Sequence, residues 1–341
     1  MADKVLYFPY IRLPENKWFT RVLLYWDEVG SIVPSEYFDN PEGLGKHMGA
    51  LVQEGQVKLV TPGDYVGQVP RFEGAFLEMI DKNPVIKARR GIALEKHETF
   101  QIHIEKFSSL VYDLGDMGLA REVNSPWYEM ESLTADLYMT YLASVLGKAE
   151  NLKMEPITDR TQSLSVYSAS FENISKPIDI FRDLRMRVVQ DILPAPTRGI
   201  PVLDLVKFKT RHRDLLRQFR RHVESSLIKI AATSDEDLRT EEARLFEEEL
   251  KEQMDQILTL MRKRHWPQIT LGAMAAAMPL VGGIVTMEPS SALLGLPPLA
   301  YAIYSAFSGA KEKQKAILNS PFAYAALAQK RYLTLSAAKR T

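Results

Sequence analysis

Short β-rich apolar runs alternate with helical hydrophobic patterns over residues 5–158, and this alternation is what most constrains the fold. Strands that alternate with helices in this way pair in parallel, through right-handed βαβ units. The sequence therefore predicts an α/β N-terminal domain with a mainly parallel sheet, followed by an all-α C-terminal region. The expected strands are residues 5–11, 32–34, 57–60, 100–104 and 156–158, and the expected helices are 18–29, 41–54, 72–80, 108–119 and 129–146.

Polar residues at the ends of the expected strands are the natural candidates for a site, because parallel α/β sheets bind ligands beyond the carboxyl ends of their strands. The set is Tyr10, Glu36, Asp64, His103, Glu105, Asp159 and Arg160. Within it, Asp64, His103, Asp159 and Arg160 are the catalytic candidates, since carboxylates with a histidine can transfer protons or hold a metal ion. The alternative is that these residues are solvated loop and capping side chains.

The usual signatures of nucleotide, hydrolase and zinc-protease sites are absent from the sequence. We therefore expect no cofactor and no dedicated metal site. The chain has no cysteine and no basic segment followed by an apolar stretch at its start, so it is expected to be cytoplasmic and to lack a signal peptide. Its formal net charge is zero, so binding to nucleic acid or anionic lipid would need a local patch.

A cluster of prolines and a glycine at residues 194–201 is the strongest break in the chain and suggests a domain boundary there. The predicted domains are residues 1–193, 194–265 and 266–341, with residues 186–193 expected as a last strand. After the break, a long amphipathic helix is expected from Leu205 and a second one from Ser234, packed as an antiparallel hairpin. The apolar line of the first helix consists of Phe208, Leu215, Phe219, Val223, Leu227 and Ile230, with His212 among them.

The two hairpin helices differ in charge. The first is basic between Lys207 and Arg221, and the second is rich in Glu and Asp. Matching of opposite charges between the two helices is the simpler interpretation. A phosphate- or nucleic-acid-binding surface on the first helix is the alternative. Residues 44–60 could form half of a winged helix, but they carry too few basic groups for DNA binding.

Residues 266–310, from Trp266 to Ala310, hold Glu288 as their only charged side chain. The first of two apolar stretches in this segment is about as long as a bilayer-spanning helix, and the second is shorter. Prolines interrupt both stretches, and small residues permit close packing in a core. Three interpretations stay open: a buried small-residue hairpin, triggered membrane insertion, or a permanent membrane span. An amphipathic helix at residues 321–335 follows.

Three segments carry a resemblance to a known group of proteins: YFPYIRLPENKWFTRVLLYWDEVGSIVP at the start, ILPAP with VLDLVKFKTRHRDLLRQFRRHV in the middle, and SPFAYAAL near the end. Together they resemble an uncharacterised family of bacterial proteins, known as a domain of unknown function. The resemblance implies a bacterial origin and a similar order of parts, but it supplies no catalytic residues. Proteins of this kind occur among accessory genes, which suggests a role in phage defence or as a toxin-like effector.

Two hypotheses of different classes follow. The first is an interaction or effector protein in which a sensing α/β domain is joined to a helical region. That region would bind a protein partner, self-associate, or contact a membrane through residues 266–310. The second is a metal-assisted phosphodiester hydrolase with its site near Asp64, His103 and Asp159.

Overall fold

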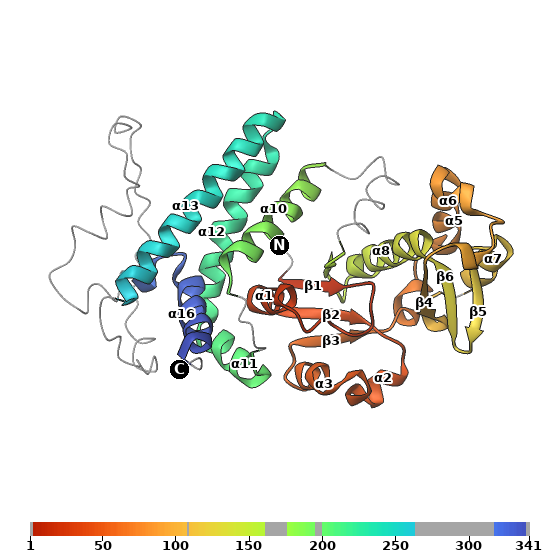
Figure 1. The fold of residues 1–341 in the computed structure, drawn as a ribbon, viewed down its shortest axis with the longest axis horizontal. Helices are drawn as coiled ribbons and strands as arrows, with labels where there is room; N and C mark the ends of the chain where they lie inside the picture. The colour runs from red at the N-terminus through yellow and green to blue at the C-terminus, as the bar shows by residue number, and fades with distance from the viewer. Residues whose placement is uncertain (1–2, 108, 161–175, 195–199, 263–316, 339–341) are drawn as a thin grey trace. The chain divides into compact units, whose positions relative to one another are not determined.

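The computed structural model describes residues 3–107, 109–160, 176–194, 200–262 and 317–338. The chain forms two compact units (Figure 1). An α/β unit contains Met1–Lys176 and Gly199–Val206, and a helical unit contains Pro177–Arg198 and Lys207–Thr341. The predicted α/β N-terminal half and helical C-terminal region are thus confirmed. Residues 177–193, which the sequence placed with the α/β domain, group with the helical unit.

One of the two sheets in the α/β unit is parallel. Its strands are β1 (Lys4–Tyr7), β2 (Glu28–Ile32), β3 (Val57–Val60) and β7 (Glu155–Ile157), in the order β3-β2-β1-β7. Val5 of β1 lies opposite Val29 of β2 on one side and Glu155 of β7 on the other. Helices α1 (Lys17–Tyr25) and α3 (Lys46–Gln53) make the first two crossovers. Asn16 starts α1 by accepting the Phe19 amide at 2.9 Å, which satisfies an otherwise unpaired donor.

A second, antiparallel sheet is inserted between β3 and β7 in the sequence. Its strands are β4 (Thr99–His103), β6 (Trp127–Glu131) and β5 (Ala120–Asn124), in the order β4-β6-β5. The strand expected at residues 100–104 is therefore present as β4, but it pairs antiparallel and lies outside the parallel sheet. The predicted helix over residues 129–146 begins later, because residues 127–131 form β6 and the helix, α8, spans Ser132–Lys148.

Helix α8 contacts β4 and β6 of the antiparallel sheet and β1 and β7 of the parallel sheet (Figure 1). Tyr138 and Leu142 of this helix are fully buried in the core of the α/β unit. The Tyr141 hydroxyl donates to the Phe72 carbonyl oxygen at 2.9 Å. The shorter helices around this core are α2 (Glu36–Asp39), η1 (Pro41–Leu44), α4 (Gly63–Val66), α5 (Phe72–Lys82), α6 (Pro84–Arg89), η2 (Leu94–Lys96), η3 (Ile104–Lys106) and α7 (Leu110–Asp116).

The described helices of the C-terminal region are α10 (Lys176–Ile192), α11 (Val202–Arg211), α12 (Arg213–Ala232), α13 (Glu236–Arg262) and α16 (Ala323–Ala338). All except α11 lie almost entirely in the helical unit, whereas α11 begins in the α/β unit and ends in the helical unit. The strand expected over residues 186–193 was wrong, since most of this run belongs to α10. The single helix expected from Leu205 is divided at His212 into α11 and α12. Helix α12 contacts both α13 and α16, and Phe219 packs against Phe322 and Tyr324. Antiparallel pairing of α12 and α13 along their whole length stays a prediction.

The predicted apolar segment, residues 266–310, lies outside the described residues. Among the helices that the structure describes, none combines the length and apolar character needed to cross a bilayer.

Candidate functional site

The order of strands in the parallel sheet places a topological switch point between β1 and β7. From β1 the chain moves outward through β2 and β3, and it then returns to place β7 on the opposite side of β1. In open α/β sheets, ligands bind in the crevice beyond the carboxyl ends of the two strands at such a point. Here β1 ends at Tyr7, and Thr158, Asp159 and Arg160 directly follow the end of β7.

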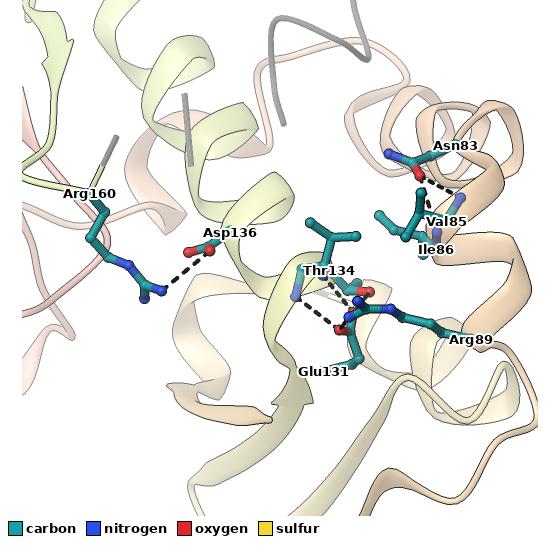
Figure 2. A network of polar contacts seen from close by, with 9 residues as sticks. Asn83, Val85, Ile86, Arg89, Glu131, Thr134, Asp136 and Arg160 are labelled. Carbon is teal, nitrogen blue, oxygen red and sulfur yellow. Dashed lines mark hydrogen bonds and ion pairs between the residues drawn. The ribbon is translucent and has the colours of Figure 1, made fainter. Parts of the chain in front are cut away.

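Five polar side chains converge beside this point, and we call them the strand-end cluster: Tyr7, Tyr10, Asp136, Asp159 and Arg160. The Tyr7 hydroxyl donates to Asp159 Oδ1 at 3.1 Å, which joins the ends of β1 and β7. Arg160 Nη1 donates to the Tyr10 hydroxyl at 3.3 Å, and Nη2 lies 3.5 Å from Asp136 Oδ2. Figure 2 shows the contact between Arg160 and Asp136.

The cluster offers hydrogen-bonding groups of both kinds. Burial, together with the negative charge of Asp159, raises the pKa of Tyr7, so its hydroxyl stays protonated and acts as a donor. Asp159 is exposed, and the Arg160 side chain keeps 22% of its surface in solvent. The Arg160 guanidinium lies 4.4 Å from the centre of the Phe100 ring, a cation–π contact that holds the side chain in place.

Glu131, which precedes α8, fixes the start of the helix that carries Asp136. Its carboxylate accepts hydrogen bonds from the Leu133 amide at 3.0 Å and from the Thr134 amide and hydroxyl at 2.8 Å (Figure 2). It also pairs with Arg89 at the end of α6. Asn83 in turn caps α6 by accepting the amides of Val85 and Ile86. This network therefore links α6 to the first turn of α8.

His103 and Glu105 make contacts that hold the turn after β4. The Glu105 carboxylate accepts the Ser35 amide at 2.6 Å and the Ser35 hydroxyl at 3.0 Å. His103 Nδ1 accepts the Glu105 amide at 3.3 Å. Burial lowers the pKa of His103, and the charges of Glu105 and Glu36 only partly oppose this effect. The histidine is therefore neutral near pH 7, and its contacts hold the connection between β4 and η3.

Lys106, in the same turn, is a buried cation near the end of β1. Its side chain is 3% exposed, and Nζ donates to the Pro9 carbonyl oxygen at 3.5 Å. Burial lowers the pKa of Lys106 to about 7. The contact with Pro9 joins the loop that carries Tyr10 to η3, which follows β4.

The comparison with known families matches residues 128–333, more than half of the chain, to a family of unknown function, DUF6236. The chain belongs to this family. No curated protein and no solved structure matches the chain. The region that matches DUF6236 includes Asp136, Asp159 and Arg160, whereas Tyr7 and Tyr10 precede it.

In this DUF6236 protein the structure brings together only some of the residues nominated from the sequence. Tyr10, Asp159 and Arg160 share the strand-end cluster. His103 and Glu105 lie in the neighbouring turn. The charge of Glu36 raises the pKa of His103 and so partly opposes the effect of burial. Asp64 is exposed in the first turn of α4, and among the described residues no hydrogen bond or ion pair joins it to His103, Asp159 or Arg160.

Sequence reasoning missed Tyr7, Asp136 and Phe100. Tyr7 could have been nominated, because it ends the first strand and its hydroxyl faces the same edge as Asp159. Asp136 had no such signal, since it lies inside the helix expected over residues 129–146, away from the ends of all the expected strands. Within the described part of this family member, no group of three or more His, Asp or Glu side chains is placed to hold a metal ion.

Proposed function

We propose that this protein is an interaction protein whose α/β unit senses a small polar ligand at the strand-end cluster and whose helical unit engages a protein partner. The observation that supports this role most strongly is the position of the cluster at the switch point between β1 and β7. Ligand sites of doubly wound α/β proteins occur at this point because the loops after the two strands diverge there.

The side chains of the cluster favour a ligand with mixed chemistry. Arg160 can take an anionic group such as a phosphate or carboxylate, because guanidinium pairs with both. Asp159 can accept hydrogen bonds from hydroxyl or amino groups, and the ring of Tyr10, 45% exposed, offers a surface for stacking. A nucleotide carries all three features, so a nucleotide-like molecule is the ligand class that we propose.

The alternative function, a metal-assisted phosphodiester hydrolase, has less support. It requires Asp64, His103 and Asp159 to act together, but Asp64 makes no described bond to the other two residues, and His103 is engaged in a turn. The described residues also supply no metal-binding group of three side chains. Membrane contact through residues 266–310 and a role in bacterial defence stay proposals. Flotation of the protein on anionic liposomes, with and without that segment, tests the membrane contact.

The test of the ligand site is calorimetric titration of the full chain with AMP, adenosine and inorganic phosphate. We expect AMP to bind more tightly than either fragment. Asp159→Asn should weaken AMP binding by about tenfold, because it removes a charged acceptor worth roughly 1.5 kcal/mol. Asp64→Asn makes the same chemical change at another strand end and should leave binding unchanged.

Either of two results contradicts the ligand proposal. One is that none of the three probes binds to the wild-type protein. The other is that Asp159→Asn and Asp64→Asn affect binding equally, which would place any site away from the strand-end cluster.

A further inference from the structure

Helix α12 carries a row of exposed basic side chains. Arg213, Arg217 and Arg221 are exposed and are spaced four residues apart, which places them on one face of the helix. Ile228, seven residues beyond Arg221, continues this face and is 45% exposed. We call these four residues the basic stripe. The opposite face of α12, which contains Phe219, Val223 and Leu227, is buried in the helical unit.

Helix α13 carries an exposed row of the opposite charge. Its members are Leu238, Glu241, Leu245, Glu248 and Glu252, which we call the acidic stripe; they are exposed and follow one another at spacings of three and four residues. Leu238 is 53% exposed and Leu245 is 51% exposed. This spacing is that of a coiled-coil seam. A separate seam of the same helix, containing Phe246, Leu250 and Ile257, is buried.

The charges of the two stripes are not used to hold α12 and α13 together. Arg213 and Arg221 form no ion pair with any described residue, and Arg217 pairs with Asp214 on its own helix. Glu241 and Glu248 pair with Arg244, also on their own helix. The charge matching between the two helices that the sequence suggested is therefore not made by these side chains. Both stripes stay available for contact with another molecule.

We propose that the helical unit pairs with a second copy of this chain, so that the basic stripe of each copy lies on the acidic stripe of the other. Helices α12 and α13 lie side by side (Figure 1). A two-fold axis between them would bring opposite charges together twice, as in an isologous dimer interface. This inference rests on the proposed role of the helical unit as a partner-binding region, and it names the partner.

A second copy fits this surface better than a polyanion does. Nucleic acid or an anionic membrane would be attracted by the basic stripe, but the neighbouring carboxylates of the acidic stripe would repel it. Leu238, Leu245 and Ile228 are exposed apolar side chains, and an apolar surface on a partner would remove them from water. Stable protein interfaces have an apolar centre with charged residues around it, and opposite charges across the contact set the register.

The first measurement is sedimentation velocity of the full chain over a range of protein concentrations. We expect a monomer–dimer equilibrium that shifts toward monomer when salt is raised, because salt screens the attraction between solvent-exposed charges and the Debye length falls from about 10 Å at 0.1 M to about 3 Å at 1 M. A wild-type chain that stays monomeric at every concentration overturns the proposal, and so does binding of duplex DNA by the monomer through the basic stripe.

Charge reversal makes the test specific. The triple variant Arg213→Glu/Arg217→Glu/Arg221→Glu and the triple variant Glu241→Lys/Glu248→Lys/Glu252→Lys should each lose at least about tenfold in dimer affinity. Mixing the two variants should restore a heterodimer, since opposite charges meet again. Lys82→Glu/Lys87→Glu, on exposed positions of the α/β unit, is the matched control and should dimerise like the wild type.

Circular dichroism of each variant checks that the helices are intact, and Arg221→Glu alone is the milder substitute if a triple variant unfolds. Dimers that persist in both triple variants, or a mixture that does not form a heterodimer, overturn the proposal. Titration of the same samples with AMP keeps the two proposals apart. A monomer that still binds AMP contradicts the dimer alone, whereas a dimer that binds none of the probes contradicts the ligand site alone.

Discussion

Glu131 is the residue on which the start of α8 depends most. Its fully buried carboxylate caps the helix and pairs with Arg89, whose side chain is 32% exposed. Glu131→Ala removes the cap and leaves the arginine without its partner. We expect the free energy of unfolding to fall by about 2–4 kcal/mol, measured by urea denaturation. Glu78→Ala, which removes the exposed partner of Arg71, should cost less than about 1 kcal/mol. Equal losses in the two variants would contradict a structural role for Glu131.

His212 should make the stability of the helical unit depend on pH. Burial lowers the pKa of His212 to about 4 from its ordinary value of 6.5, with smaller contributions from Arg211 and Arg331. The unfolded chain therefore takes up a proton at a higher pH than the folded chain does. The stabilising contribution is complete above about pH 6.5 and is lost as the pH falls toward 4, by roughly 2–3 kcal/mol in total.

Urea denaturation of the wild type and of His212→Gln between about pH 7 and pH 4 measures this contribution. The variant should be less stable at neutral pH, because it loses the ring contact with Phe208, and its stability should change less with pH. His103 and His222 also have lowered pKa values, but they are present in both proteins and cancel in the difference. Parallel pH curves for the two proteins would show that His212 does not titrate in this way.

Some residues of the strand-end cluster lie at the ends of strands, and others join it only through contacts between elements that are distant in the sequence. Asp159 and Arg160 follow an expected strand and Tyr10 lies near the end of another, so strand-end reasoning could nominate them from the sequence. Asp136 joins the site only because Arg160 reaches across to α8. Phe100 joins it only because the Arg160 guanidinium lies over its ring. Contacts of this kind depend on side-chain reach between elements, which hydrophobic periodicity does not encode.

At the scale of elements, Gly147 permits the closest approach between α8 and the chain leading to β7. A Cβ atom at this position would lie 2.3 Å from the Met154 carbonyl oxygen, a backbone atom that cannot move aside easily. The Gly147 carbonyl also accepts the Met154 amide at 3.0 Å. Gly147→Ala should therefore lower the free energy of unfolding by about 1–3 kcal/mol, although alanine is the better helix former.

Gly74 in α5 is the matched control for this substitution, since a Cβ atom there would meet no atom within 4 Å. Gly74→Ala should leave stability unchanged or raise it by up to about 1 kcal/mol, because alanine loses less conformational entropy in a helix. Thermal denaturation followed by circular dichroism measures both variants. Stabilisation by Gly147→Ala would show that α8 can shift away from residue 154 at little cost.

Elements with a long, clean hydrophobic period were the ones that the sequence could predict. The helix from residue 72 was found because its buried residues Phe72, Phe76, Met79 and Ile80 recur at helical spacing. Strand β5 was missed because only Ala120 of its five residues is buried, so no alternation is visible. The strand expected at the end of α10 was wrong because the residues before position 186 were not considered with it. Residues 186–193 read as a strand, but the buried Leu184, Val188 and Ile192 are spaced as in a helix.

At the scale of the whole molecule, the region that matches DUF6236 does not coincide with a folding unit. It begins at residue 128, inside β6, and continues through both compact units to residue 333. Strand β7 lies within the region, but its partner in the sheet is β1, which precedes it. Both strands that pair with β6, namely β4 and β5, also lie before residue 128 and therefore outside the matched region.

We therefore expect a fragment of residues 128–333 to fold only in part. Without β1, β4 and β5, the strands β6 and β7 have no described partner, and the apolar residues of α8 that pack on both sheets would be exposed to water. Proteolysis of the fragment should cleave α8 and β7 rapidly while sparing α12 and α13, whereas the full chain should resist cleavage at all four elements. Adding residues 1–127 as a separate chain supplies the missing strands and should restore protection of α8. Full protection of α8 in the fragment alone would mean that the helix is stabilised by residues outside the two sheets.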